Sequence, residues 1–483
     1  MYDIGLLIGD GERASAGGAV FERHNPMTNA VATVAVAANL DDVKAACDAA
    51  QAAFPGWAKT GPNARRALLL KAADAVAAKG DAFVAAMKSE TGATEGWARF
   101  NVMLAADMLR EAASLTTQVA GETIPSDKPG CLALALRVPA GVCVGIAPWN
   151  APVILGVRAV ATPLACGNTV VLKTSEACPR THYLIGEALR EAGFPPGVVN
   201  VISNAPQDAA AVVNALIDHP AVRRINFTGS TRVGKLIAER AGGQLKPVLL
   251  ELGGKAPLVV LKDADLDEAV KAAAFGAFFN QGQICMSTER IIVEEAVADA
   301  FVEKFAAKAK SLVAGDPAAG TTPLGAVVSP EAIATVQALI ADAVGKGAKV
   351  VAGGQADGIL MNATVVDGVT KAMKIYGDES FGPVVAVMRA KDTDDAVRMA
   401  NDTEYGLSAS VFSQNVATAL SVAQRIESGI CHINGPTVHD EAQMPFGGVK
   451  GSGYGRFGGK AGIAEFTDLR WITIETLPGQ YPI

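Results

Sequence analysis

The spacing of apolar residues changes once along the chain, near residue 142. Before that point they recur every three or four positions, which predicts amphipathic helices. These helices are predicted over residues 41–54, 64–78, 81–89 and 95–118. After it, short apolar runs that are typical of buried strands alternate with helical stretches. The strands are predicted at 142–147, 169–172, 198–202 and 224–227, and the helices between them at 152–164 and 179–192. This alternation predicts a doubly wound parallel sheet, whose ligands bind beyond the carboxyl ends of its strands.

A second series of the same kind follows after residue 251. Its strands are predicted at 258–261, 291–293, 348–352, 384–388 and 408–412, and its first two helices at 265–277 and 296–312. We therefore place a boundary between two α/β domains near Glu251. Segments 132–138 and 470–475 alternate like exposed strands, and either can add to the sheet of a neighbouring subunit.

Length and composition limit the class of protein. A chain of 483 residues exceeds one ordinary core, and half of its residues are hydrophobic with few aromatics, as in a packed α/β enzyme. The net charge of −7 without a run of Lys and Arg argues against a nucleic-acid partner. Neither a membrane span nor a signal peptide is expected. Seven scattered cysteines without a C-x-x-C pair suggest neither zinc nor disulfides, so a reducing cytoplasm fits best.

One cysteine, Cys285, stands where a predicted Ala-rich helix gives way to a Gly-containing break. A thiol at such a boundary lies near free backbone N–H groups, so it can be held partly ionised and can reach a ligand. The alternative is a buried structural cysteine, because free cysteines are among the residues most often buried in proteins. The clusters described next favour the reactive alternative.

Polar residues follow two of the predicted strands directly. Asn150 comes after Pro148 and Trp149, so its amide either donates a hydrogen bond to a developing oxyanion or completes a turn. Lys173 and Glu176 suit the two hydroxyls of a ribose, and Glu176 would repel a 2′-phosphate, which favours NAD over NADP. A solvated surface pair is the alternative for these two residues.

The segment from Phe227 to Gly234 opens a predicted helix, where free N–H groups attract phosphate. Gly229 and Gly234 have the spacing of a P-loop and Lys235 follows. However, Leu236 stands where a P-loop needs Ser or Thr for Mg²⁺. A nucleotide triphosphatase is therefore disfavoured, and phosphate binding is preferred to a simple helix cap.

Glu251 ends an apolar strand and precedes two glycines. Burial there would raise the pKa of its carboxyl toward that of a general base for a thiol or a water. Pairing with Lys255 or Lys246 would instead make it structural. A hydrolase that pairs Cys285 with His432 is an alternative of another class, but it leaves the dinucleotide-like first half unexplained.

Together these clusters resemble the aldehyde dehydrogenase superfamily over essentially the whole chain. Seven stretches carry the resemblance in the family's order: 148–150, 173–176, 227–230, 251–255, 282–285, 379–383 and 445–448. Each is weak alone, whereas the collinear set is specific. Segments 110–127, 281–290 and 434–456 are similar to bacterial aromatic aldehyde dehydrogenases, such as those for vanillin and salicylaldehyde.

The resemblance implies an α/β fold in three parts and a homodimer or homotetramer without a metal. The parts are a Rossmann-like NAD-binding domain (1–118 and 138–250), a related α/β catalytic domain (251–450) and a small β bridging and oligomerisation element (119–137 and 451–483). By the same resemblance Cys285 would be the nucleophile. Asn150 and the Cys285 backbone N–H would form the oxyanion hole, and Glu251 would activate water.

The resemblance also implies a nicotinamide cofactor, NAD in preference to NADP. Lys173 and Glu176 would hold the adenine ribose and Ser230 the pyrophosphate. Glu379 would hold the nicotinamide ribose, with Phe381 beside the ring. The other residues implied at the cofactor are Ile146, Pro148, Trp149, Ser175, Phe227, Gly229, Gly234 and Leu252.

An aromatic aldehyde of the vanillin or salicylaldehyde type needs a wall of aromatic, Met and Ile side chains. The candidates for this wall are Trp97, Asn101, Trp149, Ile154, Ile284, Met286, Met444 and Phe446. Arg158 would either meet a ring hydroxyl or lie in solvent. A semialdehyde is the nearest alternative substrate. It would need two or more convergent cations, and only Arg158 and Arg290 are candidates for them.

Overall fold

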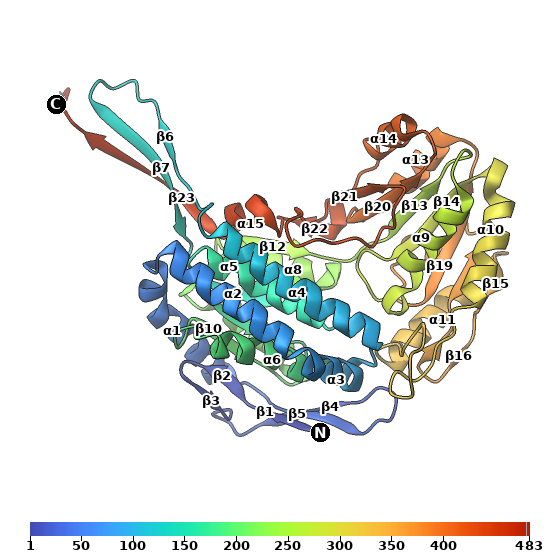
Figure 1. The fold of residues 1–483 in the computed structure, drawn as a ribbon, viewed down its shortest axis with the longest axis horizontal. Coiled ribbons are helices and arrows are strands. Elements are labelled where there is room, and N and C mark those ends of the chain that lie inside the picture. Colours follow the sequence, from blue (N-terminus) through green and yellow to red (C-terminus); the bar gives the residue numbers. More distant parts are fainter. Residues whose placement is uncertain (480) are drawn as a thin grey trace.

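Two sheets with mainly parallel strands organise the protein in the computed structural model, which describes residues 1–479 and 481–483 (Figure 1). The first sheet has the strand order β22-β12-β11-β8-β9-β10-β2-β3. Its strands are β2 (Leu6–Ile8), β3 (Gly11–Arg13), β8 (Val142–Ile146), β9 (Thr169–Lys173), β10 (Val199–Ile202), β11 (Val222–Thr228), β12 (Val248–Glu251) and β22 (Gly453–Tyr454). The five strands from β12 to β10 are parallel, so their carboxyl ends meet at one edge.

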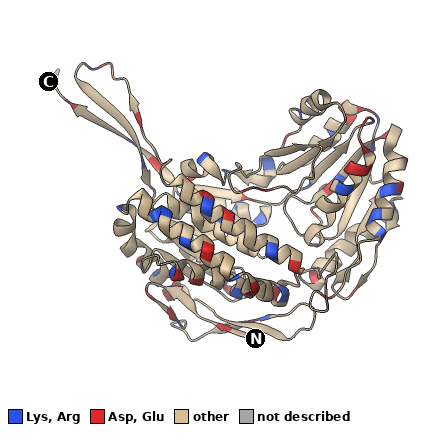
Figure 2. Cartoon of the chain, viewed as in Figure 1, with Lys and Arg blue, Asp and Glu red and all other residues tan. Residues whose placement is uncertain are grey.

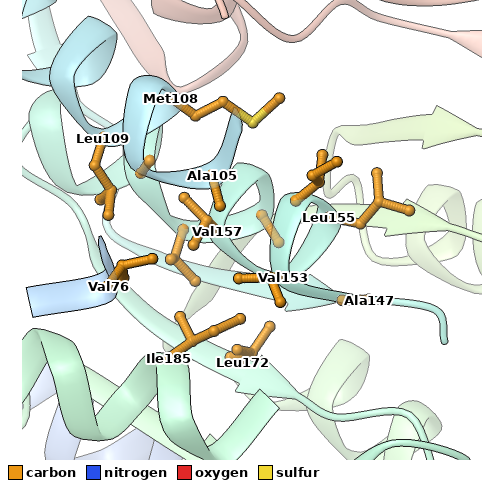
Figure 3. Close-up of a cluster of buried hydrophobic side chains, with 14 of the residues drawn as sticks. Val76, Ala105, Met108, Leu109, Ala147, Val153, Leu155, Val157, Leu172 and Ile185 are labelled. Carbon is orange, nitrogen blue, oxygen red and sulfur yellow. The ribbon is translucent and has the colours of Figure 1, made fainter. Parts of the chain in front are cut away.

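Helices cover this first sheet. They are α1 (Leu40–Ala58), α2 (Pro62–Ala78), α3 (Gly80–Thr91), α4 (Glu95–Leu115), α5 (Pro152–Ala165), α6 (Pro179–Glu191), α7 (Ala209–Asp218) and α8 (Thr231–Gly243). Every residue of α5 is buried, as expected for a helix that is apolar on all sides. Figure 3 shows Val153 and Val157 of α5 among Ala105 and Leu109 of α4 and Leu172 of β9. Helix α5 therefore lies in the core between α4 and the sheet.

The second sheet has the order β15-β18-β19-β14-β13-β20-β21 and is parallel except for its edge strand β15. Its strands are β13 (Ala256–Val260), β14 (Thr288–Glu294), β15 (Lys349–Ala352), β18 (Thr364–Asp367), β19 (Val384–Ala390), β20 (Ser408–Phe412) and β21 (Ile430–Ile433). The helices in this half are α9 (Leu266–Phe278), α10 (Glu295–Lys310), α11 (Pro330–Gly345), α12 (Lys374–Gly377), α13 (Thr393–Asn401) and α14 (Val416–Ala423), and α15 (Gly459–Glu465) follows later.

Three strands form an arm that projects from the body (Figure 1). They are β6 (Glu122–Ile124), β7 (Cys131–Pro139) and β23 (Thr467–Glu475), and β7 pairs with β23 along the whole length of both strands. Trp471 on β23 is 77% exposed. The remaining small sheets are β1 (Tyr2–Ile4) with β5 (Val31–Val36) and β4 (Val20–His24), and β16 (Ala356–Asp357) with β17 (Leu360–Met361).

The α/β fold predicted from the sequence is confirmed, and most predicted elements end within a few residues of the observed ones. One assignment differs, because residues 453–454 pair with β12 in the first sheet although they fall in the stretch assigned to the bridging element. Acidic and basic residues are interspersed along the chain (Figure 2). Among the described residues no helix is long and apolar enough to cross a membrane.

Candidate active site

Cys285 lies in a tight turn that follows an abrupt break of α9. The helix ends at Phe278 and passes into a single 3₁₀ turn, η2 (Phe279–Gly282), in which Asn280 and Gln281 have φ of +48° and +55°. Two consecutive left-handed residues other than glycine are strained and need support from their surroundings. The Gln281 amide supplies it by donating to the Ala326 carbonyl oxygen at 2.8 Å and accepting from the Gly325 N–H at 2.9 Å.

Asn150 is tied to the loop that carries the thiol. It follows β8, and its Nδ2 donates to the Gln283 carbonyl oxygen at 3.0 Å. The Asn150 carbonyl oxygen in turn accepts from Trp97 Nε1 at 2.9 Å and from Asn280 Nδ2 at 3.1 Å. A side-chain amide has two N–H groups, so a second donor remains at Asn150 for an anionic oxygen.

Glu251 ends β12 and is 1% exposed. Neither carboxylate oxygen has a hydrogen-bond partner among the described residues. Burial raises the pKa of the Glu251 carboxyl to about 8, although Arg158 and Arg456 act to lower it. A buried carboxyl without partners gains and loses its proton near neutral pH, which is the property of a general base.

The Cys285 thiol is coupled to this carboxyl. Burial raises the pKa of Cys285, and the negative charge of Glu251 raises it further. Burial therefore opposes the partial ionisation that the position of this cysteine allows. The loop after β12 also touches the nucleophile turn, since a Cβ on Gly254 would lie 2.3 Å from the Cys285 carbonyl oxygen.

An apolar pocket lies over Cys285. Six residues predicted for the substrate wall line it: Trp97, Ile154, Arg158, Ile284, Met286 and Phe446. Residues that the sequence did not suggest complete the wall, among them Phe100, Leu104, Phe275, Phe279 and Val438. Phe100, Leu104 and Phe275 lie on helices, where their spacing does not distinguish a pocket wall from a core face, and Val438 lies in a loop without a marker.

Three of the predicted wall residues lie elsewhere. Asn101 is fully buried and its Nδ2 donates to the Trp97 carbonyl oxygen at 3.0 Å, so it fixes α4 internally. Met444 is 45% exposed and lines a separate small cavity behind Arg158. Trp149 lines the groove described below.

Arg158 is not solvated, which rules out one of the two alternatives. Its guanidinium is buried and forms an ion pair with Asp440, and it stacks 4.2 Å from the centre of the Phe446 ring. Asp440 had no motif around it to mark it in the sequence. Burial raises the pKa of the Asp440 carboxyl, although Arg158 acts against this rise.

A groove of about 1050 Å³ follows the carboxyl ends of the first sheet. Nine predicted cofactor residues line it: Ile146, Pro148, Trp149, Lys173, Ser175, Glu176, Phe227, Gly229 and Ser230. Lys173 forms an ion pair with Glu176, whose carboxylate also accepts from Asn204 Nδ2 at 2.8 Å. A cation and a carboxylate fixed at a strand end fit a ribose with two free hydroxyls.

Ser230 caps α8, accepting from the Val233 N–H at 3.4 Å. Only two residues separate β11 from α8, so there is no P-loop to wrap a phosphate, and Gly234 and Lys235 lie within the helix. Gly234 and Leu252 do not line the groove. Instead a Cβ on Gly234 would lie 2.4 Å from Leu252 Cδ2, so this glycine lets α8 approach the loop after β12.

Glu379 and Phe381 approach the site from the second half of the chain. Glu379 Oε1 accepts from the Gly254 N–H at 2.8 Å, and burial raises the pKa of the Glu379 carboxyl to about 7. Phe381 has a φ of +47° and meets the Trp149 ring edge-on at 5.7 Å. Sequence reasoning missed the support for this loop, which is Glu289, buried beside Lys255 and accepting from the Phe381 N–H at 3.0 Å.

The alternative pairing of Cys285 with His432 has no support in the geometry. His432 lies on β21, and its ring packs 5.0 Å from that of His439. In the part of the chain that the structure describes, no hydrogen bond joins Cys285 to a histidine, and His432 does not line the pocket. A thiol hydrolase of the Cys–His type is therefore not what these residues form.

The turn at Cys285, the buried Glu251 carboxyl and the groove are an arrangement that a nicotinamide-dependent thiol enzyme requires. The chain belongs to the aldehyde dehydrogenase family, whose model matches residues 13–472. It is accordingly an oxidoreductase that acts on aldehydes with NAD or NADP.

Individual relatives are similar over the full length. A vanillin dehydrogenase of Pseudomonas fluorescens is 60% identical, with 100% of both chains covered. A crystal structure of a salicylaldehyde dehydrogenase from Pseudomonas putida G7 complexed with salicylaldehyde has a TM-score of 0.99 and 49% identity, covering 100% of each chain. A structure of PnpE in complex with nicotinamide adenine dinucleotide has a TM-score of 0.95 and 35% identity, covering 99% of each chain.

Proposed function

We propose that this enzyme oxidises hydroxybenzaldehydes of the vanillin or salicylaldehyde type to their carboxylic acids, with NAD in preference to NADP. The observation that carries the proposal is the buried, unpartnered Glu251 carboxyl, which is coupled to Cys285 beneath an aromatic pocket. The similarity to vanillin and salicylaldehyde dehydrogenases supports the substrate class.

In the first step, Cys285 Sγ adds to the aldehyde carbon and gives a thiohemiacetal. Because the resting thiol is neutral, it loses its proton to solvent as the carbon–sulfur bond forms. The negative charge that develops on the former carbonyl oxygen is stabilised by the free N–H of the Asn150 amide and by the Cys285 backbone N–H. Anchoring of Asn150 through Gln283 and Trp97 keeps this donor in place before the reaction.

The groove would hold the cofactor that the next step requires, and a nicotinamide bound there would accept a hydride. Lys173 and Glu176 would bind the adenine ribose, and the N-terminus of α8 at Ser230 would bind the pyrophosphate. Glu379 would bind the nicotinamide ribose, with Phe381 beside the nicotinamide ring.

In the last step a water hydrolyses the Cys285 thioester to the acid. Glu251 takes the proton of that water, for which a pKa of about 8 is well suited near neutral pH. The regenerated thiol then returns to its neutral resting state.

The charge balance of the pocket disfavours a semialdehyde, which carries a carboxylate. Arg158 is neutralised by Asp440. Arg290 is fully buried and donates to the backbone carbonyl oxygens of residues 255, 399, 400 and 402. Neither cation is left to hold a second carboxylate, whereas apolar and aromatic side chains suit a ring.

We also propose that the arm assembles the chain into a homodimer or homotetramer. Its strand β23 exposes Leu469, Trp471 and Ile474, and isolated edge strands with exposed apolar residues favour pairing with another chain. A cytoplasmic location is proposed as well, because the nucleophile must remain a reduced thiol.

A panel of substrates tests the function. We expect NADH formation with vanillin, salicylaldehyde and benzaldehyde, with kcat/KM at least tenfold above that for succinic semialdehyde. The variant Cys285→Ser should fold and bind NAD but form no NADH, and Cys131→Ser, at a half-buried cysteine far along the chain from Cys285, is the matched control. Preference for the semialdehyde, or turnover by Cys285→Ser, would contradict the proposal.

A further inference from the structure

One carboxylate oxygen in the substrate pocket lacks a partner. The Asp440 side chain is buried, and Asp440 lines the cavity above Cys285. Its Oδ2 is committed to the Arg158 guanidinium, whereas its Oδ1 is buried and makes no hydrogen bond to any described residue. Leaving a buried acceptor unsatisfied is unfavourable, so such an atom in a binding pocket points to a ligand that supplies the donor.

The surroundings of this oxygen specify the donor. The rest of the lining is mostly aromatic and aliphatic, and the Arg158 side of Asp440 is closed by the ion pair and by the Phe446 ring. A cation is disfavoured, because Arg158 already supplies the positive charge. A neutral hydroxyl on a flat ring fits both the apolar wall and the single free acceptor.

We propose that Asp440 is the specificity residue for the substrate's ring hydroxyl, accepting its hydrogen bond at Oδ1 while Arg158 holds the carboxylate at Oδ2. This inference rests on the proposed oxidation of aromatic aldehydes and identifies what distinguishes hydroxybenzaldehydes from plain benzaldehyde. Arg158 is then a positioning residue, since it acts on the substrate through Asp440.

The test compares Asp440→Asn with the wild-type enzyme on 2-, 3- and 4-hydroxybenzaldehyde and on benzaldehyde. Benzaldehyde lacks the hydroxyl and reports every other effect of the substitution, including effects on Glu251. A hydrogen bond to a charged acceptor is among the stronger hydrogen bonds. We therefore compare kcat/KM for each hydroxybenzaldehyde with kcat/KM for benzaldehyde. In Asp440→Asn this ratio should fall roughly tenfold or more for at least one ring position. Glu441→Gln, an exposed charge removed one residue away, should leave all ratios unchanged.

A second measurement uses the unaltered enzyme and covers the case in which Asp440→Asn does not fold. Hydroxybenzyl alcohols and fluorobenzyl alcohols have no carbonyl, so as competitive inhibitors they report binding without the electronic effect of the substituent on the reaction. We expect the hydroxyl compound to bind at least roughly tenfold more tightly than its fluoro counterpart at the preferred ring position.

The outcomes separate this inference from the proposed function. Unchanged ratios in Asp440→Asn, or an equal loss with benzaldehyde, would overturn the role of Asp440 and leave aromatic aldehyde oxidation standing. Equal inhibition by hydroxyl and fluoro compounds would overturn it as well. Failure of the wild-type enzyme to oxidise any benzaldehyde would instead reject the proposed function, and the inhibition constants would still decide whether Asp440 selects a hydroxyl.

Discussion

Replacing Glu251 by glutamine keeps the size and shape of the side chain and removes its ability to take a proton. A pKa of about 8 means that roughly 10% of Glu251 is ionised at pH 7 and roughly 1% at pH 6. If Glu251 activates the water, turnover limited by thioester hydrolysis rises about tenfold per pH unit below pH 8 and levels off above it. In Glu251→Gln this dependence should vanish, and turnover should fall roughly 100-fold or more.

Formation of the thioester should survive in the same variant. Because the charge of Glu251 raises the pKa of Cys285, its removal makes the thiol easier to ionise. Rapid mixing with NAD and vanillin should therefore give a burst of about one NADH per active site, followed by a slow steady state. Glu295→Gln, which changes an exposed residue at the start of α10, is the control and should behave as the wild-type enzyme.

Two results would refute this reasoning. Absence of the burst would place Glu251 before hydride transfer or make it structural. A wild-type steady-state rate that stays flat between pH 6 and 8 would show that the ionisation of Glu251 does not limit hydrolysis.

Three further predictions concern the same site. Asn150→Ala should lower kcat with vanillin by roughly 100- to 1000-fold. The dissociation constant of NAD, measured by fluorescence titration, should stay within about threefold of the wild-type value. An equal loss of NAD affinity would instead assign Asn150 to cofactor binding. Glu176→Gln should raise the ratio of NADP to NAD use, measured as kcat/KM for each cofactor, because the carboxylate that repels a 2′-phosphate is gone; an unchanged ratio would count against that role. Finally, the folded wild-type protein retains a proton on Glu251 that the unfolded chain releases above pH 4.5. As the pH rises from 5 to 9, the melting temperature of the wild-type protein should therefore fall relative to that of Glu251→Gln. An equal change of melting temperature with pH in the two proteins would contradict the raised pKa of Glu251.

Sequence reasoning located most of the groove because parallel strands place their ends together. Lys173, Glu176 and Ser230 each follow a strand of the first sheet, and strand ends are visible in the spacing of apolar residues. Gly234 illustrates the limit of this reasoning. Its position in a phosphate-like motif suggested a ligand, yet close packing against Leu252 is what requires the glycine.

The substrate pocket was harder to predict because its walls come from α4, α5, α9 and the segment before β22. Trp97, Ile154 and Phe446 were found through a chemical expectation, whereas Asp440 had no marker in the sequence. The raised pKa of Cys285 was also not predicted, because burial depends on every neighbour and not on the local turn alone.

The left-handed backbone at Asn280 and Gln281 has a consequence for changing the enzyme's substrate. This turn fixes the position of the proposed nucleophile Cys285, whereas much of the wall above it is built from side chains on other segments. Engineers can therefore vary positions such as Leu104 or Val438 to reshape the cavity without disturbing how the sulfur is presented. Libraries that randomise residues 280–282 should mostly return inactive protein.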